Sequence, residues 1–429
     1  MIQATLLPTQ EKTCLQTDPK SSDTNTRYLN GLRGIAALLV YLHHHAFHSH
    51  ACQNGPAIFA NAFGYDGKYY ISTFPIIRLF FSGGPVAVSI FFVISGYVLA
   101  LQPLRALHSH DSEKLLRHIG SGIFRRWTRL FLPVAITTFI WAMSWHIFDI
   151  MPANRANTIR LEATQWATNF LRYSFLFKDV PNAYNEHTWS IAFEFRGSMV
   201  IYTSLLAFRH LTTAFRILAQ ALLTSYFLWL VDGPYYACFT AGLLLADIDT
   251  QHLSTQVPPT ICRLTSYLII PLFLLALHLA GVPTHQPEDI SYLRSSPGWY
   301  ILSYLTPSNY SVFYHFWSAV LLIVTIPRLP VIRKILESKG CQYLGRISYS
   351  LYLVHGPILW SLGDAVYGAL GCIDGQGGIF GLERRVLLAQ CVLLLGTIGV
   401  AEVCTRVVDG NSVRFSKWLG RRGRIGGGG

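Results

Sequence analysis

The sequence predicts an all-α fold, a polytopic bundle of about ten transmembrane helices with both termini in the cytosol. Of the 429 residues, 51% are hydrophobic and only 13% are charged, and the mean hydropathy is +0.35. This composition is far more apolar than that of a soluble protein of the same size. Recurring apolar runs and an uneven distribution of basic residues support the same fold class.

The apolar runs have roughly the twenty residues that a helix needs to cross a bilayer. They cover residues 31–49, 84–102, 130–148, 189–208, 215–231, 234–247, 264–281, 309–326, 347–362 and 386–404. With a cytosolic N-terminus, 24 Lys and Arg residues fall on the cytosolic side and 9 on the other. Because cytosolic loops collect Lys and Arg, we expect an even number of spans. Membrane topology therefore explains the net charge of +12, and we expect no nucleic-acid partner.

The chain divides most simply into one membrane domain between two tails. Residues 1–27 are polar and predict a disordered cytosolic tail, and residues 406–429 predict a basic, Gly-rich cytosolic tail. Residues 28–405 hold all the apolar runs. The first span is expected to act as an uncleaved signal anchor, because the first 26 residues lack an apolar core.

The first span carries titratable groups, which are functional candidates inside a membrane. It begins Arg27-Tyr-Leu-Asn-Gly-Leu-Arg-Gly34 and reaches three consecutive histidines at 43–45. Arg33 and His44 are eleven positions apart, so they lie within about 20° of one helix stripe and roughly 16 Å apart along the axis. A polar stripe on an apolar helix indicates a helix that lines an internal cavity. His43 points elsewhere but remains a rival to His44.

The second and third spans add small residues and arginines. Ser89, Ser95 and Gly96 are small enough to let helices approach closely. At the start of the third span, Arg125 and Arg129 are four apart and share one helix face. Guanidinium groups bind phosphate oxygens well, although taken without the other motifs these arginines are better explained as cytosolic anchors of the span.

The fourth span repeats polar residues on one face, with Ser190, Glu194 and Ser198 four positions apart. A carboxylate at this depth needs a partner. Glu194 can pair with Arg196 or His187 as a structural strut, or it can position a substrate hydroxyl or a histidine.

The ninth span begins with Ser348, Tyr352 and His355 on one stripe. A single intramembrane histidine of this kind more often packs through a hydrogen bond than it catalyses. The eight cysteines form no CxxC pair and show no zinc-type spacing with histidine, so we expect no metal site.

Taken together, these stretches resemble the acyltransferase-3 family of integral-membrane O-acyltransferases, in particular its fungal natural-product type. The resemblance rests on five elements in the family's order. They are Tyr28-Leu-Asn-Gly-Leu-Arg-Gly with His44, Phe-Phe-Val-Ile-Ser-Gly ending at Gly96, Arg125-Arg-x-x-Arg-Leu, Trp189-Ser-Ile-x-x-Glu, and Ile347-Ser-Tyr-Ser-Leu-Tyr-Leu-x-His. One departure is Asn30, where many relatives have Asp.

The resemblance implies transfer of an acyl group, usually acetyl, from acyl-CoA to a hydroxyl, with acetyl-CoA as donor substrate and no permanently bound cofactor. His44 would be the general base, because a histidine can take the hydroxyl proton near neutral pH. Arg33 would stabilise negative charge or hold a CoA phosphate, and Glu194 would orient the histidine or the acceptor. An acyl-histidine intermediate is an alternative route. Two further sets complete the predicted site: Arg125, Arg126 and Arg129 for CoA, and Trp189, Ser190, Tyr352 and His355 for the substrate.

The acceptor expected from the resemblance is a small apolar alcohol, a terpenoid or polyketide of fungal secondary metabolism. Such a molecule can partition into the bilayer and reach an intramembrane pocket from the side. The expected location is the endoplasmic reticulum or another endomembrane. Acetylation of a cell-surface glycan or lipid is an alternative. A secondary transporter is another, since intramembrane His, Glu and Arg also build substrate sites.

Overall fold

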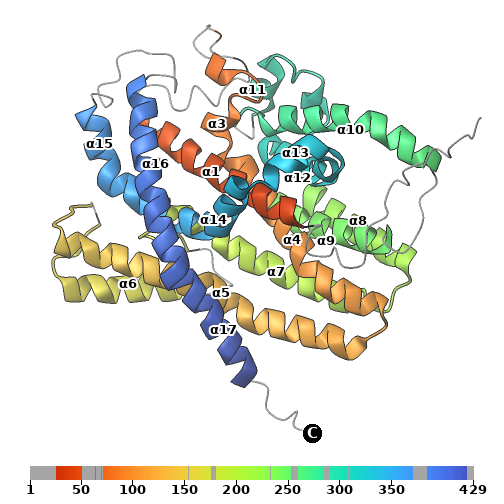
Figure 1. The fold of residues 1–429 in the computed structure, drawn as a ribbon, viewed down its shortest axis with the longest axis horizontal. Helices are drawn as coiled ribbons and strands as arrows, with labels where there is room; N and C mark the ends of the chain where they lie inside the picture. The colour runs from red at the N-terminus through yellow and green to blue at the C-terminus, as the bar shows by residue number, and fades with distance from the viewer. Residues whose placement is uncertain are drawn as a thin grey trace, which may run out of the picture.

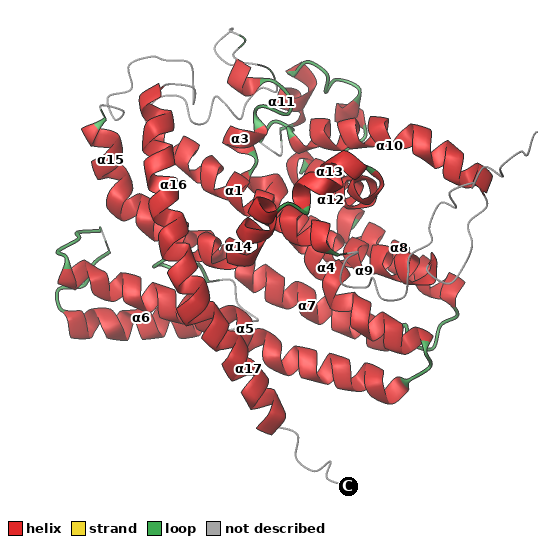
Figure 2. Cartoon of the chain, viewed as in Figure 1, coloured by secondary structure: helices red, strands yellow, loops and turns green. Residues whose placement is uncertain are grey.

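The computed structural model describes residues 26–50, 63, 69, 71–152, 154–174, 180–231, 233–252, 259–284, 289–307, 309–370 and 384–422. Throughout these residues the regular structure is helical, and no strand is present among them (Figure 2). The predicted all-α class is therefore confirmed. The predicted N-terminal tail lies almost entirely outside the described residues.

Every predicted apolar run overlaps a helix, and further helices, such as Ile159–Ser174 and Gly410–Arg422, lie outside the predicted runs. In chain order the helices are α1 (Arg27–His50), α3 (Leu79–Ser82), α4 (Gly84–His108), α5 (Ser112–Ile147), α6 (Ile159–Ser174), α7 (Trp189–Ala207), α8 (Thr213–Trp229), α9 (Pro234–His252), α10 (Pro259–Ala280), α11 (Ile290–Ser295), α12 (Tyr310–Thr325), α13 (Pro330–Leu336), α14 (Lys339–Ile358), α15 (Asp364–Ala369), α16 (Arg384–Cys404) and α17 (Gly410–Arg422). Short 3-10 turns lie at Ile71–Thr73, Glu186–Thr188, Leu302–Tyr304 and Ile326–Arg328, and π-helical turns at Leu359–Gly363 and Thr405–Asp409.

By length and composition, four helical stretches of the described chain are long and apolar enough to cross a membrane. They are Gly84–His108, Ser112–Ile147, Tyr310–Arg328 and Arg384–Gly420. This supports a helical membrane protein, while the total of ten spans and the sidedness of the termini stay predictions.

Helix α4 lies at the centre of the bundle and packs against α9, α1, α12 and α7 (Figure 1). Its contact with α9 depends on small residues. A Cβ added to Gly242 would come within 2.6 Å of the backbone nitrogen of Tyr97, and a Cβ on Gly96 would meet the backbone of Phe239. The prediction that a small residue in this span lets helices approach closely is thus confirmed at Gly96.

Helix α5 begins much earlier than the apolar run predicts. The run starts at residue 130, whereas α5 starts at Ser112, after Asp111, whose carboxylate accepts a hydrogen bond of 2.8 Å from the Lys114 backbone N–H. The first half of the helix is polar and basic, so hydropathy alone does not detect it, although the Asp N-cap is a helix-start signal. The arginines of this segment therefore lie in mid-helix rather than at a helix start.

The C-terminal end continues as helix where the sequence predicts a tail. Helix α16 runs through the π-helical turn Thr405–Asp409 into α17, which packs against α5. Figure 1 shows α17 projecting from the bundle beside α5. The residues assigned to the basic tail are consequently helical as far as Arg422.

Candidate active site

Helices α1 and α14 run parallel and cross at glycines. This crossing determines which side chains of the two helices lie next to each other in the turns that follow. Asn30 donates to the Gln342 side chain over 3.2 Å. One turn further along α1, a Cβ added to Gly34 would come within 2.5 Å of the Gly345 backbone nitrogen. Because the backbones touch at these glycines, the segments that follow, with His44 on α1 and His355 on α14, remain side by side.

Three histidines from three segments meet at this end of the crossing, and we call them the histidine cluster: His44, His187 and His355. His44 Nδ1 lies 3.0 Å from His355 Nε2. The His187 ring lies 3.8 Å from the His44 ring and 4.8 Å from the His355 ring, measured between centroids. His355 is buried, whereas His44 and His187 are half-buried. Part of His44 and part of His187 are therefore exposed, whereas His355 is enclosed.

His187 is held by the elements around it. It belongs to the 3-10 turn before α7, and its ring stacks on Trp360 with a centroid distance of 5.0 Å. Trp360 lies in the π-helical turn that follows α14, an irregularity that is frequent at functional sites. A Cβ on Gly356 would come within 2.5 Å of the His187 ring. Its Nε2 is buried and has no hydrogen-bond partner.

Two of the predicted substrate residues are joined beside this cluster. The hydroxyls of Ser190 and Tyr352 lie 2.7 Å apart, and the Tyr352 hydroxyl also donates to the His187 carbonyl. Trp189, in contrast, is 39% exposed and contacts Phe193 and Tyr235, with centroid distances of 5.7 and 5.5 Å. The structure thus places Ser190, Tyr352 and His355 together, and Trp189 on the outer face of α7.

A second polar group, the arginine cluster, is centred on an ion pair and comprises Arg33, Arg126, Arg129 and Glu194. Arg126 and Glu194 form a salt bridge in which the side chains are only 9% and 16% exposed. Arg126 also donates to Ser198 over 2.8 Å and to Ser95 over 3.1 Å, and Ser95 donates to Glu194. A buried charge needs such partners, so Ser95 and Ser198 complete the pair.

The other arginines of the motif differ in their surroundings. Arg33 interacts electrostatically with Arg129, Arg126, Glu194 and Asp409. Arg125 turns away: its Nε donates to the Ser121 carbonyl over 3.0 Å, and its side chain lies against Gly420 of α17. Arg33, Arg126 and Arg129 therefore concentrate positive charge in one place, whereas Arg125 faces α17.

The two clusters occupy different levels of the bundle. On α1, Arg33 and His44 are separated by eleven residues, or about 16 Å along the axis. On α7, Ser190 lies beside the histidines and Glu194, one turn later, pairs with Arg126. Neither of the partners considered for Glu194, Arg196 and His187, is the one found, since Arg196 stands 4.8 Å over the Phe193 ring. His44 accordingly has His355, rather than Glu194, as its neighbour.

His43, the rival of His44, lies outside the histidine cluster. A Cβ on Gly84 would come within 2.7 Å of its ring, so His43 fills the space at the start of α4. His45 is fully buried, and its Nδ1 lies 3.0 Å from the Tyr367 hydroxyl. The His43 ring lies 5.2 Å from the His44 ring, measured between centroids. Of the three consecutive histidines, only His44 has described ring contacts with both His187 and His355.

The ring nitrogens of the histidine cluster lie close enough together to bind one metal ion. One nitrogen from each of its three histidines lies within 4.8 Å of the others. However, the His187 and His355 rings are nearly parallel, at 18°, whereas ligand lone pairs must converge on a shared ion. The 3.0 Å contact between His44 and His355 has the length of a hydrogen bond. The ring geometry therefore favours a shared proton over a shared metal.

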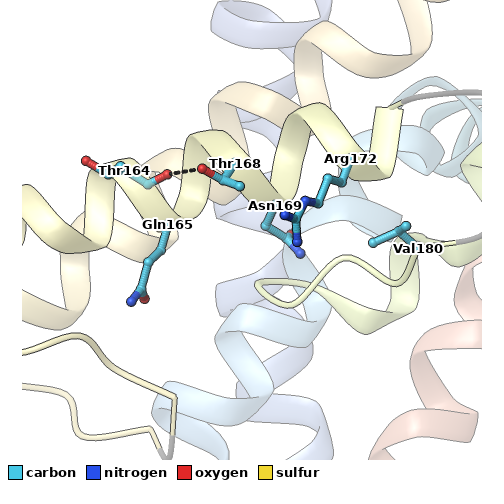
Figure 3. A pocket seen from close by; sticks show the side chains of 6 residues that line it. All are labelled: Thr164, Gln165, Thr168, Asn169, Arg172 and Val180. Carbon is cyan, nitrogen blue, oxygen red and sulfur yellow. Dashed lines mark hydrogen bonds between the residues drawn. The ribbon is translucent and has the colours of Figure 1, made fainter.

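A hollow of about 260 Å³ lies elsewhere, along α6. Figure 3 shows Thr164, Gln165, Thr168, Asn169 and Arg172 facing it from one helix, with Val180 beyond. Thr168 donates to the Thr164 carbonyl over 2.9 Å. None of the predicted site residues lines this hollow.

The sequence did not assign a site role to His187, Ser95 or Ser198. His187 follows Asn185 and Glu186 in a polar segment directly before α7. This position is the one feature of the sequence that indicates a site role for His187. Ser95 and Ser198 look like small packing residues in an apolar helix, and only their contacts with Arg126 give them another role.

The comparisons with known proteins agree with one another. A profile described as an acyltransferase domain, acyltransferase 3, matches residues 26–405. The O-acetyltransferase PaAT-1 of Phomopsis amygdali is 30% identical over 446 aligned residues, which cover 93% of this chain and 85% of the relative.

Two further fungal relatives are more distant. The acyltransferase clz18 of Cochliobolus lunatus is 22% identical, with 90% of this chain and 93% of the relative covered. The acyltransferase R4 of Phoma sp. is 23% identical, with 90% and 94% covered. No solved structure matches this chain.

Proposed function

The chain belongs to the acyltransferase-3 family, and from this premise we propose that it is a multi-pass membrane O-acyltransferase that uses acyl-CoA. It transfers an acetyl or other short acyl group to a hydroxyl of a small apolar acceptor, a terpenoid or polyketide. The observation that carries the proposal is the position of His44, which is half-buried and held against His355. A fixed and accessible imidazole is suited to general-base catalysis.

In the proposed reaction, His44 first accepts a proton and later returns it. The acceptor hydroxyl gives its proton to His44 as its oxygen attacks the thioester carbonyl carbon. The tetrahedral intermediate then collapses, the C–S bond breaks, and the proton passes from His44 to the departing CoA thiolate. The products are the ester and free CoA, so protons and electrons balance without a further reactant.

The arginine cluster supports binding of the CoA phosphates. Arg33 and His44 are about 16 Å apart along α1, which is too far for Arg33 to contact a carbonyl carbon under attack near His44. The extended pantetheine arm of CoA separates its phosphates from its thioester, so the donor can span both clusters. Arg33 and Arg129 then bind phosphate oxygens. Arg126, which is already paired with Glu194, adds positive charge beside them without contacting the phosphates.

The acceptor enters along the outer face of α7. Trp189 is 39% exposed and lies with Phe193 and Tyr235 in an aromatic group. The next residue, Ser190, contacts Tyr352 beside the histidines. An apolar alcohol dissolved in the bilayer can reach the histidine cluster past this aromatic group. The proposed location in the endoplasmic reticulum or another endomembrane gives access to cytosolic acyl-CoA.

The test measures thiol release from acetyl-CoA by the detergent-solubilised protein with a panel of hydroxylated terpenoids and polyketides. We expect acceptor-dependent release, reduced by roughly 10²–10⁴-fold in His44→Gln because the general base is lost. The matched control is His48→Gln, one turn further along α1, where His48 contacts Asp364 instead of the cluster. Size-exclusion chromatography confirms that each variant is folded. Equal release by the parent and His44→Gln would rule out His44 as the base.

A further inference from the structure

The hydrogen bonds of His355 fix which of its ring nitrogens carries the proton. Its Nδ1 lies 2.8 Å from the carbonyl oxygen of Tyr352 and 3.2 Å from that of Leu351. A carbonyl oxygen can only accept a hydrogen bond, so Nδ1 must donate. In a neutral imidazole the other nitrogen is then an acceptor. His355 therefore presents a lone pair at Nε2.

This lone pair fixes the proton of His44 in turn. His355 Nε2 lies 3.0 Å from His44 Nδ1. Since the first nitrogen accepts, the second must donate, and the His44 proton resides on Nδ1. The lone pair of His44 is left on Nε2, the atom that is not engaged with His355.

We infer that His355 is a positioning residue that holds His44 in the tautomer whose Nε2 is the basic atom. This inference rests on the proposed role of His44 as general base. It assigns His355 a different role from the substrate contact that the sequence predicts, and it gives His355 the orienting role that the sequence predicts for Glu194. Such a hydrogen bond selects both the tautomer and the ring orientation of a working histidine.

The surroundings of His355 suit this role. It is 1% exposed and sits in the last turn of α14, where its Nδ1 is tied to the backbone of its own helix. The parallel crossing at Gly34 and Gly345 fixes the distance between the two helices. When His44 takes the acceptor proton, its Nδ1–H still points at a lone pair, so the imidazolium is stabilised without any movement of the site.

The kinetic test compares two variants of His355. In His355→Gln, the amide oxygen can occupy the place of Nε2 and still accept from His44, whereas His355→Leu fills similar space and accepts nothing. We expect kcat to fall roughly 10–100-fold in His355→Leu, by analogy with groups that orient a working histidine, with the KM for acetyl-CoA unchanged. His355→Gln should recover most of the loss. Equal rates for the two variants would overturn the inference.

A chemical test reads the lone pairs without any acyl transfer. Diethyl pyrocarbonate modifies unprotonated imidazole nitrogens, and peptide mass spectrometry identifies the histidine modified. We expect His44 to react in the parent while His355 stays protected, because both its nitrogens are engaged. In His44→Ala, His355 loses its donor and should become reactive. His48, half-buried on the same helix and in contact with Asp364 instead of the cluster, is the internal control.

The two tests separate failure of this inference from failure of the proposed function. If His355 reacts in the parent as fast as His44, or if His44 is unreactive while His48 reacts, the tautomer assignment is wrong. If the reactivity pattern is as expected but no acceptor supports thiol release, the acyltransferase proposal fails while the tautomer assignment stands.

Discussion

The histidine cluster and the arginine cluster share helices α1 and α7 but treat their polar atoms differently. In the arginine cluster, Arg126 has a carboxylate and two hydroxyl partners. In the histidine cluster, the rings have mainly one another, and His187 Nε2 has no partner. A buried charged group without a partner is strongly destabilising. A buried nitrogen of a neutral imidazole without a hydrogen-bond partner costs only about 1–3 kcal/mol. The arginine cluster therefore fixes charged side chains in place, whereas the histidine cluster has a nitrogen, His187 Nε2, that can still form a hydrogen bond with a substrate.

The largest effect is expected where the arginine cluster is broken. Glu194→Gln leaves the buried Arg126 guanidinium without its carboxylate, which typically costs about 3–5 kcal/mol. Thermal unfolding in detergent should show a clearly lower midpoint. The double variant Glu194→Gln with Arg126→Met should regain much of the loss. An unchanged midpoint in the single variant would mean that the pair is not buried as described.

A smaller effect is expected from removing a phosphate contact. Arg33→Gln should raise the KM for acetyl-CoA by roughly 10–100-fold with little change in kcat, because a hydrogen bond to a charged group contributes about 1.5–3 kcal/mol. Steady-state kinetics at saturating acceptor measures both constants. A fall in kcat with an unchanged KM would instead place Arg33 at the transition state, at the level of the histidine cluster.

The helix crossing that aligns the two clusters can be disturbed directly. Gly345→Ala inserts a methyl group against the Asn30 backbone, and overpacking of this kind costs about 1–3 kcal/mol. The matched control is Gly340→Ala on the same helix, where a Cβ meets nothing within 4 Å. The unfolding midpoint should fall in Gly345→Ala and not in Gly340→Ala. Equal midpoints for the two variants would show that the helix crossing accommodates the added methyl group without strain.

A still smaller effect is expected from an exposed pair near the histidines. His48 and Asp364 are 2.8 Å apart, with side-chain exposures of 26% and 74%. Exposed pairs contribute about 0–1 kcal/mol, so His48→Gln should leave the unfolding midpoint nearly unchanged. A large fall would show that this pair supports the cluster through α15.

No effect is expected from removing metal ions. Since the ring planes of His187 and His355 are nearly parallel, treatment with EDTA should change neither thiol release nor the unfolding midpoint. Elemental analysis of the purified protein provides the complementary measurement. Stoichiometric zinc that disappears in His187→Ala would contradict the sequence-based expectation of no metal and assign the cluster to an ion.

The sequence by itself determined the fold class and the positions of most helices, because apolar runs need local helical backbone wherever they enter a membrane. Each predicted run coincides with a described helix. The more polar helical segments were missed: the start of α5 at Ser112, α6 at Ile159–Ser174 and α17 at Gly410–Arg422. The family and the set of polar residues worth attention were also readable, since charged or titratable groups such as Arg33, Glu194 and His44 stand out in apolar helices.

Only the tertiary structure decided how those residues combine. The periodicity of α7 puts Ser190 and Glu194 on one stripe, yet one meets Tyr352 and the other Arg126. Helical spacing describes which way a side chain points from its own helix, whereas a partner depends on how two helices cross. Here the crossing is set by backbone contact at Gly34 and Gly345, far along the chain from each other, and that contact brings His355 to His44.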